Sequence, residues 1–492
     1  MLTKEVLGRL FAVAIVGVFA LEIGFESLAQ EGLTRAAYIT MAILLVAATL
    51  WVTEAVPLFV TSLLVLFLCV VWLTPAMKAA SLDVTKDDFF APFFSDIIVL
   101  FLGGFALSAA LHKRRLDEWL AAAIIRRTGD TMPKLMFGVM LATAFLSMWV
   151  SNTATAAMML ATVLPIAAKL PESNGYGRAL ILSVPFAANI GGLGTPIGTP
   201  PNAIAMQYMK ELGIQPGFAT WMMIALPGVA AMLLLAWTLL IVMYRGKPPA
   251  TQDPATKDPA TKDSINNHDS PAEGQTPDFD IGELARQQSA VQLQKDATFY
   301  VIAVTVVITA LGWMTAAFHG QSSGMVAMLP LLVFFGTGVL NAGDLRNMSW
   351  DVLLMMGGGL CLGAAISESG LALWLVEQLP ISGLSVFWLM VMFSSFACLL
   401  ASLMSNTATA NMVMPLLIGL NVENLALVMI GVAFGCSLAM PLPVSTPPNA
   451  MAFASGRIKV GDLVRPGVIL TVSGVFLAMT TGYWWWNLVG IG

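Results

Sequence analysis

Long apolar runs alternate with short polar segments along most of the chain. A helix of about 20 apolar residues crosses the hydrocarbon core of a bilayer. Uninterrupted runs of roughly that length lie near 7–25, 36–55, 57–74, 94–111, 220–244, 297–318, 325–340, 350–367 and 465–489. Two more, near 179–209 and 423–455, are interrupted by Gly and Pro, and two others, near 135–168 and 385–420, have polar residues at their centres. The pattern predicts an all-α protein that crosses a membrane many times.

The positions of Lys and Arg predict the orientation, because cytoplasmic loops carry an excess of both. With a cytoplasmic N-terminus, 20 of the 24 basic residues lie inside and four lie outside: Arg35, Lys78, Lys86 and Lys210. This count holds only if 135–168 and 385–420 each enter and leave the membrane on one side. We therefore expect about eleven transmembrane helices plus two re-entrant hairpins.

Composition supports this class and excludes several others. The 492 residues are 58% hydrophobic and 11% charged, whereas soluble domains are about 25% charged. The net charge of -5, without a basic aromatic face, argues against nucleic acid as a partner. The four cysteines lie in apolar runs and the three histidines are scattered, so we expect buried cysteines and no zinc or haem enzyme.

One hydrophilic segment, 246–296, separates the two halves of the chain. It contains a tandem DPATK at 253–257 and 258–262 and is rich in Pro, Asp, Lys, Gln and Asn. Such composition cannot bury a core, so we expect a flexible cytoplasmic linker without chemistry of its own.

The two halves of the chain repeat each other. SNTATAAMM at 151–159 matches SNTATANMV at 405–413 in seven of nine positions, at an offset of 254. TPPNA at 199–203 recurs unchanged at 446–450. By the predicted topology the two copies enter from opposite sides, which makes an inverted repeat. Inverted repeats are typical of secondary transporters, whose substrate sites lie at the midplane where broken helices from both halves meet.

The broken helices are suited to ions of both signs. Pro200-Pro201 and Pro447-Pro448 remove backbone donors and disfavour helix before them. The carbonyl groups freed there need partners, and a sodium ion, a hard cation, is one. The half-helix that follows directs its N–H groups and positive dipole end at the break, where an anion fits.

The lack of cationic side chains around the Ser-Asn-Thr motifs predicts that the anion and the sodium ion bind together. No Lys, Arg or His lies in 135–168 or 385–420. A dianion buried there would lack a countercharge, at a high cost in free energy. Bound cations can supply that charge, so anion and cation should bind together.

Each feature also has a purely structural interpretation. Ser and Thr often join helices in membranes, and the glycines at 103–104 and 357–359 permit close helix packing. Asp96 and Asp351 begin predicted spans, where helix capping is the default role. Glu54 lies near the end of a span, beside Pro57, and we expect a structural role for it. Only the paired occurrence of both motifs favours a binding site.

These paired motifs, together with TEAVP at 53–57, resemble those of the divalent anion/sodium symporter family, the INDY-type dicarboxylate transporters, over nearly the whole chain. The resemblance implies a homodimer embedded in membrane lipid. Within each protomer a mobile transport domain would slide across the membrane against a scaffold domain, which is an elevator mechanism. It also implies C4-dicarboxylates, citrate or sulfate as substrates. We expect a multi-pass protein of the bacterial inner (plasma) membrane.

The resemblance also assigns residues by motif. The substrate would contact Ser151, Asn152, Thr153, Thr199, Ser405, Asn406, Thr407, Thr446 and Pro447. One sodium ion would bind at Ser147, Ser151, Asn152 and Gly198. A second would bind at Ala401, Met404, Asn406 and Ser445. Asn411 replaces Ala157 of the first half and is expected to tune the pocket. No catalytic residue and no organic cofactor is expected.

The same resemblance divides the chain into domains. Scaffold spans would occupy 1–95, 220–245 and 297–349. The transport domain would comprise a first repeat at 96–219 and a second at 350–462, and 463–492 would form a C-terminal span.

The leading hypothesis is a sodium-coupled importer of succinate, malate or fumarate. The alternatives are a dicarboxylate exchanger on the same fold, a citrate or sulfate transporter, an anion channel and an intramembrane enzyme. An exchanger should replace sodium with a fixed cationic side chain, and an enzyme needs a nucleophile and base or a metal cluster. Neither feature occurs near the motifs.

Overall fold

We describe the fold from a computed structural model. It describes residues 33–128, 131–170, 175–214, 216–244, 295–378, 383–420 and 422–490. The predicted span at 7–25 lies outside these residues, as does the predicted linker except for 295–296. Every regular element in the described part of the chain is a helix, as the apolar pattern predicts.

The first half of the chain forms helices that follow the predicted runs closely. They are α2 (Arg35–Thr53), α3 (Leu58–Leu68), the π-helix η1 (Cys69–Leu73), α4 (Thr74–Ala79), α5 (Lys86–Phe90), the 3-10 helix η2 (Ala91–Phe94), α6 (Asp96–Lys113), α7 (Leu116–Thr128), α8 (Met132–Ser147), α9 (Asn152–Ala168), α10 (Gly175–Gly192), α11 (Pro200–Glu211) and α12 (Phe218–Met243).

The second half is helical as well. Its helices are α14 (Ala297–Met314), α15 (Ala316–His319), α16 (Ser323–Gly336), α17 (Ala342–Arg346), α18 (Trp350–Glu368), α19 (Leu371–Gln378), α20 (Val386–Leu403), α21 (Asn406–Leu417), α22 (Leu425–Ser437), α23 (Pro447–Ala454), α24 (Val460–Leu477), the π-helix η3 (Ala478–Gly482) and α25 (Tyr483–Leu488).

Eight helical stretches of the described chain are long and apolar enough to cross a membrane. Seven of them match uninterrupted runs of the sequence, and the eighth, Val386–Leu403, is the first arm of the predicted second hairpin. The run at 325–340 forms the shorter helix α16, and both Gly- and Pro-containing runs form two helices with a break between them. The chain is therefore an all-α polytopic membrane protein.

Both predicted hairpins are pairs of packed helices. The chain turns between α8 and α9 at 148–151 and between α20 and α21 at 404–405, and the two helices of each pair contact one another. Each turn therefore lies beside a Ser-Asn-Thr motif.

In each broken helix, the segment after the break packs on the hairpin of the other repeat. In each repeat the segment before the break packs on its own hairpin, α10 on α8 and α9, and α22 on α20 and α21. Beyond the break, α11 packs on α21 and α22, while α23 packs on α9 and α10. The four helix ends at the two breaks are thereby brought together in the interior.

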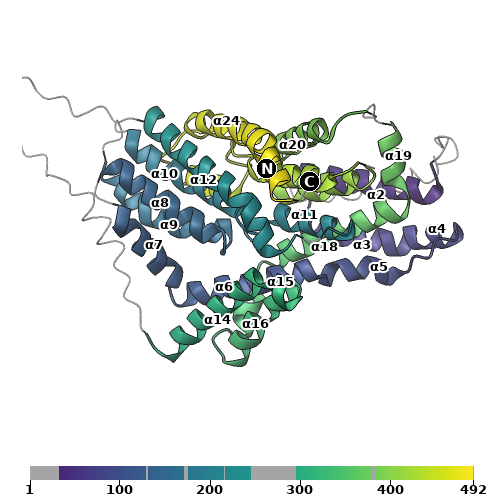
Figure 1. Cartoon of the computed structure of the whole chain (residues 1–492), viewed down its shortest axis with the longest axis horizontal. Helices are drawn as coiled ribbons and strands as arrows, with labels where there is room; N and C mark the ends of the chain where they lie inside the picture. Colours follow the sequence, from purple (N-terminus) through teal and green to yellow (C-terminus); the bar gives the residue numbers. More distant parts are fainter. Residues whose placement is uncertain are drawn as a thin grey trace, which may run out of the picture.

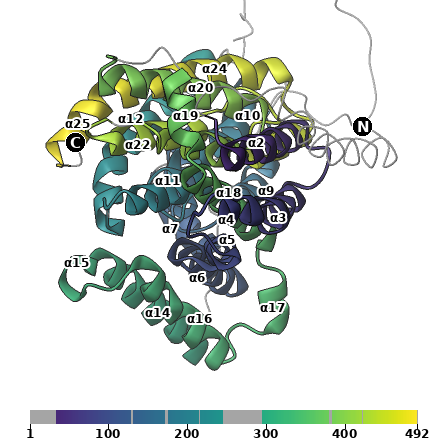
Figure 2. The same cartoon turned by 90° about the vertical axis from the view of Figure 1, so that its right-hand side faces the viewer.

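α12 and α24 pack on this first group of hairpins and broken helices, α12 on α8 and α10 and α24 on α12 and α20, whereas α2–α6 and α14–α18 form a second group. α6 packs along α16, and α18 packs along α3 and η2 on one side and along α21 of the first group on the other. α14, α15, α16 and α17 lie at one side of the molecule, next to α6 (Figures 1 and 2). α7 leads from α6 to α8, and α19 leads from α18 to the second hairpin, so these two short helices connect the groups. All four cysteines are buried, as predicted.

Candidate functional site

The two Ser-Asn-Thr motifs lie where α9 and α21 begin. Ser151 and Ser405 are the residues that precede these helices, and both have extended backbones with ψ near 133°. Neither side chain makes a capping hydrogen bond, so both hydroxyl groups are available for other partners. The first N–H groups of a helix have no acceptor within it. Each hairpin tip therefore presents hydroxyl, amide and backbone donors together.

Proline sets the geometry of the two helix breaks. Thr199 and Thr446 have nearly the same extended conformation, with φ and ψ of -152° and 143°, and -144° and 148°. A residue before proline is driven out of the helical region, whereas proline itself fits the first helical position. The Thr-Pro-Pro sequence therefore starts the second segment in both repeats, whereas the first segments already end at Gly192 and Ser437.

The asparagine of each Thr-Pro-Pro-Asn motif binds the carbonyl groups freed by the break. Asn202 Nδ2 donates to the carbonyls of Gly192 (3.0 Å) and Thr195 (2.9 Å). In the second repeat, Asn449 Nδ2 donates to the carbonyls of Met440 (3.0 Å) and Leu442 (3.1 Å). Both side chains are fully buried. These contacts hold the irregular backbone in place and satisfy groups that would be costly in an apolar interior.

A cavity of about 700 Å³ lies where the hairpin tips and the breaks meet. All nine residues assigned to the substrate line it: Ser151, Asn152, Thr153, Thr199, Ser405, Asn406, Thr407, Thr446 and Pro447. The wall facing these motifs belongs to the other group of helices and includes Glu54, Pro57 and Asp351. The cavity thus lies between the two groups.

The electrostatics of the cavity favour an anion accompanied by cations. The helices α9, α11, α21 and α23 all begin at its wall, and each directs its positive dipole end there. Its lining, in the part of the chain described, includes no Lys, Arg or His. The lining does include the carboxylates of Glu54 and Asp351, so partial charges of about half a unit at each helix start are the only positive charge in the described lining, and a dianion needs cations to enter with it.

The residues assigned to the first sodium ion bring together more hydrogen-bond acceptor oxygens than there are donor hydrogens to satisfy them. The Ser147 hydroxyl lies within hydrogen-bond distance of both Asn152 Oδ1 and the Ala188 carbonyl (2.8 Å for the latter). A hydroxyl has one hydrogen, so it can satisfy only one of these acceptors. A Cβ on Gly198 would lie 2.3 Å from the Gly192 carbonyl oxygen, so only glycine fits this approach. A small hard cation suits this cluster.

The residues assigned to the second sodium ion include an acceptor without a partner. Asn406 Oδ1 is buried and has no hydrogen-bond partner among the described residues. Ala401, Met404 and Ser445 are buried as well. The Ser445 hydroxyl donates to the Ser402 carbonyl (3.0 Å) and accepts from the Leu442 N–H (3.3 Å), which leaves one lone pair for another partner. The donor set is again one of neutral oxygen atoms, the ligands that alkali ions prefer.

Sequence reasoning missed three asparagines that build the site. Asn202 and Asn449 lay within the recognised motif, and their repetition was a usable signal for a role in the break. Asn189 carried no such signal, because the corresponding position of the second repeat is Cys436. Asn189 also lines the cavity. Asn411, expected to tune the pocket, instead donates from Nδ2 to the Met355 carbonyl (2.9 Å) and does not line the cavity.

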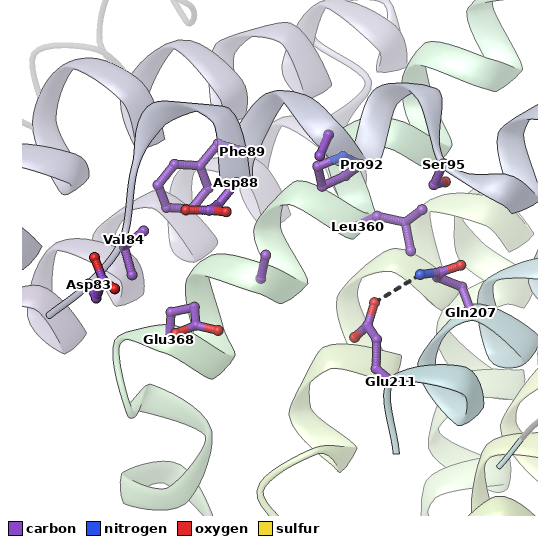
Figure 3. Close-up of a pocket in the computed structure, with 12 residues that line it drawn as sticks. Asp83, Val84, Asp88, Phe89, Pro92, Ser95, Gln207, Glu211, Leu360 and Glu368 are labelled. Carbon is purple, nitrogen blue, oxygen red and sulfur yellow. Dashed lines mark hydrogen bonds between the residues drawn. The ribbon is translucent and has the colours of Figure 1, made fainter. Parts of the chain in front are cut away.

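A second cavity, of about 490 Å³, lies near the other end of α18 (Figure 3). Its lining includes four carboxylates: Asp83, Asp88, Glu211 and Glu368. Glu211 accepts a hydrogen bond from Gln207 (3.2 Å). So many negative groups would repel a dianion, which leaves the cavity between the repeats as the candidate anion site.

Comparisons with known proteins agree with this architecture. The family model described as "Citrate transporter" matches residues 48–427 and 322–489. The sodium-dependent dicarboxylate transporter SdcS of Staphylococcus saprophyticus is 31% identical over 486 residues, covering 92% of this chain and 87% of the relative. SdcS of Staphylococcus aureus (strain USA300) is 32% identical over 479 residues, covering 90% and 85%.

Two solved structures share the fold at low sequence identity. The YdaH transporter of Alcanivorax borkumensis has a TM-score of 0.52 and 16% identity, covering 82% of this chain and 88% of that one. MtrF of Neisseria gonorrhoeae, described with a class of antimetabolite efflux pumps, has a TM-score of 0.52 and 12% identity, covering 82% and 84%. Because the family model and the curated relatives match most of its length, the chain belongs to the divalent anion/sodium symporter family of membrane transporters.

Proposed function

We propose that this protein is a secondary active transporter that imports C4-dicarboxylates such as succinate, malate and fumarate together with sodium ions. The observation that carries the proposal is a single cavity with two donor-poor oxygen clusters, four helix N-termini and no cationic side chain in its described lining. The relatives named sodium-dependent dicarboxylate transporters support the same substrate and ion.

Charge balance explains why the two solutes move together. Removing an ionised carboxylate from water costs several kcal/mol unless a partner compensates it. A sodium ion about 4 Å from a carboxylate recovers about 4 kcal/mol at an effective dielectric constant of 20. Sodium at Ser147, Ser151, Asn152 and Gly198, and at Ala401, Met404, Asn406 and Ser445, would supply two positive charges beside the two hairpin tips. The substrate would then lie between them on Ser, Asn and Thr side chains.

Uptake by reconstituted protein tests the proposal. Proteoliposomes should accumulate labelled succinate with external sodium and not with choline. Asn152→Ala and Asn406→Ala should abolish accumulation, whereas Asn487→Ala, an exposed asparagine distant from the cavity, should not. Competition by unlabelled succinate, citrate and sulfate identifies the preferred anion. Equal uptake in choline with nothing to exchange inside would refute sodium coupling.

The dicarboxylate exchanger on the same fold is tested by counterflow. Vesicles preloaded with succinate, without a sodium gradient and with choline on both sides, should show no exchange under our proposal. Rapid exchange in choline would establish the exchanger instead. An anion channel would show flux that does not saturate with substrate.

We further propose an elevator mechanism, with a boundary drawn from helix packing. The group α2–α6 and α14–α18 would be the scaffold, and α8–α12 and α20–α25 would move with the cavity. This places α6 and α18 in the scaffold and α12 and α24 in the transport domain, and so differs from the boundaries expected at 96, 220, 350 and 463. The contacts that a slide would break include Lys210 with Asp96 (3.8 Å) and Tyr208 with the Gly359 carbonyl (3.3 Å).

Cross-linking tests this movement. The variant carrying Asp96→Cys and Lys210→Cys, treated with a bifunctional thiol reagent of about 10 Å, should lose uptake and regain it on cleavage of the reagent. Each single variant serves as the control, and the native cysteines are buried. Full uptake by the cross-linked protein would exclude sliding at this contact. The expected homodimer and the cytoplasmic N-terminus in a bacterial inner membrane complete the proposal.

A further inference from the structure

Asn189 is a polar residue at the cavity that the repeat does not duplicate. It lies on α10, one turn before the helix ends at Gly192, and its side chain is 97% buried (3% exposed) at the cavity wall. We propose that Asn189 is a positioning residue that holds the Thr446 hydroxyl as a hydrogen-bond donor to a substrate carboxylate. This inference rests on the proposed function and deepens it.

The hydrogen bonds around Asn449 decide how Asn189 is oriented. Asn449 Nδ2 faces two carbonyl oxygens, those of Met440 and Leu442, so its Oδ1 must point the other way. Asn189 lies on that side, with its Nδ2 3.3 Å from Asn449 Oδ1. Only an N–H group is attractive to that oxygen, so the network itself fixes which end of the Asn189 amide faces it.

The same amide nitrogen contacts Thr446. Asn189 Nδ2 donates to Thr446 Oγ1 at 3.1 Å, and the backbone N–H of Asn449 donates to the same oxygen at 3.4 Å. A hydroxyl group has two lone pairs and one hydrogen. With both lone pairs engaged, the Thr446 hydroxyl can act further only as a donor. Thr446 lines the cavity, so this donor is available to an anion there.

The first repeat shows what the arrangement is like without such a residue. The position equivalent to Asn189 is Cys436, which has no amide to donate. Asn202 Oδ1, the counterpart of Asn449 Oδ1, is buried without a hydrogen-bond partner among the described residues. The Thr199 side chain makes no capping hydrogen bond. The two threonines therefore differ: the rotation of the Thr446 hydroxyl is restricted, and that of Thr199 is not restricted by an amide.

This asymmetry has a consequence for substrate binding. A hydroxyl already oriented as a donor spends no free energy on reorientation when a carboxylate arrives. Loss of one hydrogen bond to a charged group lowers affinity by about tenfold or more. We therefore expect Asn189 to act on the apparent affinity for the dicarboxylate much more than on the maximal rate.

Uptake kinetics of Asn189→Cys, which installs the residue of the other repeat, test the inference. The KM for succinate should rise about threefold to tenfold at saturating sodium, no more than in Thr446→Val, which loses the hydrogen bond itself, with the maximal rate within about twofold of wild type. The near-isosteric Asn189→Asp should raise KM further, because an ionised carboxylate cannot donate and repels the substrate. Cys436→Ala, at the equivalent position outside the cavity, is the matched control and should keep the wild-type KM.

A double-mutant comparison identifies the route through Thr446. Thr446→Val removes the hydroxyl at nearly constant shape and should raise KM by itself. Added to it, Asn189→Cys should raise KM less than twofold, because the group on which it acts is already gone. An unchanged KM in Thr446→Val, an unchanged KM in both Asn189 variants, or effects that simply multiply would each overturn the inference.

The failure of this inference is distinguishable from that of the proposed function. Wild-type protein that takes up no succinate with sodium contradicts the function. Wild-type uptake with unaffected variants contradicts only the role of Asn189. If Asn189→Cys does not fold, the near-isosteric Asn189→Asp, alone and combined with Thr446→Val, decides.

Discussion

The buried oxygen of Asn406 leads to a prediction in which one substitution has opposite effects in two salts. Asn406 Oδ1 has no hydrogen-bond partner among the described residues. A buried acceptor left unsatisfied costs about 1–3 kcal/mol. Asn406→Ala removes this acceptor, and alanine is the better helix former at the start of α21. In choline chloride the variant should therefore be at least as stable as the wild type.

In sodium chloride the order of stability should reverse. A ligand that binds only the folded protein stabilises it by RT ln(1 + [L]/Kd), which is about 2.7 kcal/mol at a sodium concentration of 100 times Kd. If Asn406 Oδ1 is a sodium ligand, its loss should raise the midpoint of the sodium titration at least tenfold, or about 1.4 kcal/mol. The wild type then gains stability on adding sodium and the variant gains much less.

The assay is thermal unfolding of purified protein, followed by the fluorescence of its 13 tryptophans, at constant ionic strength with sodium exchanged for choline. Asn411→Ala is the matched control, because Asn411 lies on the same helix, is fully buried and has an Oδ1 that likewise lacks a hydrogen-bond partner among the described residues, while its Nδ2 donates to the Met355 carbonyl at 2.9 Å. Asn411 does not line the cavity, so its substitution should change stability equally in both salts and keep the full sodium response. Equal destabilisation of Asn406→Ala in both salts would refute the assignment.

Three further predictions concern other parts of the molecule. Gly198→Ala should abolish sodium-driven uptake, because its Cβ would lie 2.3 Å from a backbone oxygen, whereas Gly228→Ala, whose Cβ meets nothing closer than 3.9 Å, should not. Lys113 and the Asn341 N–H hold the pKa of Asp344 below its ordinary value, so their contribution to stability is present at neutral pH and lost as the pH falls through that lowered pKa. Lys113→Met should raise this pKa toward its ordinary value of about 3.9, so the variant should unfold at a lower temperature at neutral pH and lose less stability below about pH 4; an unfolding temperature equal to that of the wild type on both sides of about pH 4 would contradict it. Deleting about 35 residues within 250–290 should leave uptake nearly unchanged, and its loss would show that the segment is more than a linker.

The sequence was most informative where one motif occurs twice. The repeated Ser-Asn-Thr and Thr-Pro-Pro-Asn segments located the turns and breaks, because proline and helix-start geometry act locally and need no knowledge of the rest of the fold. The nine residues assigned to the substrate indeed line one cavity. Their contacts with solute remain a prediction.

The features that the sequence could not predict depend on contacts between distant segments. Asn189 meets Thr446 and Asn449, more than 250 residues away, and nothing local to Asn189 indicates such partners. The packing of α6 on α16 and of α18 on α3 likewise joins segments far apart in the chain. Apolar helices do not reveal which neighbours they choose, because their faces are similarly hydrophobic all round.

The exchange of α11 and α23 between the repeats has a consequence for biogenesis. Segments emerging from a ribosome fold in order, N-terminal parts first. α11 packs on α21 and α22, which are synthesised about 200 residues later. Until α21 and α22 have been synthesised, α11 of the nascent first half must therefore stay in the translocon or the lipid without its packing partners. A chain that stops prematurely after α12 would leave α11 exposed, which marks such a product for quality-control proteolysis.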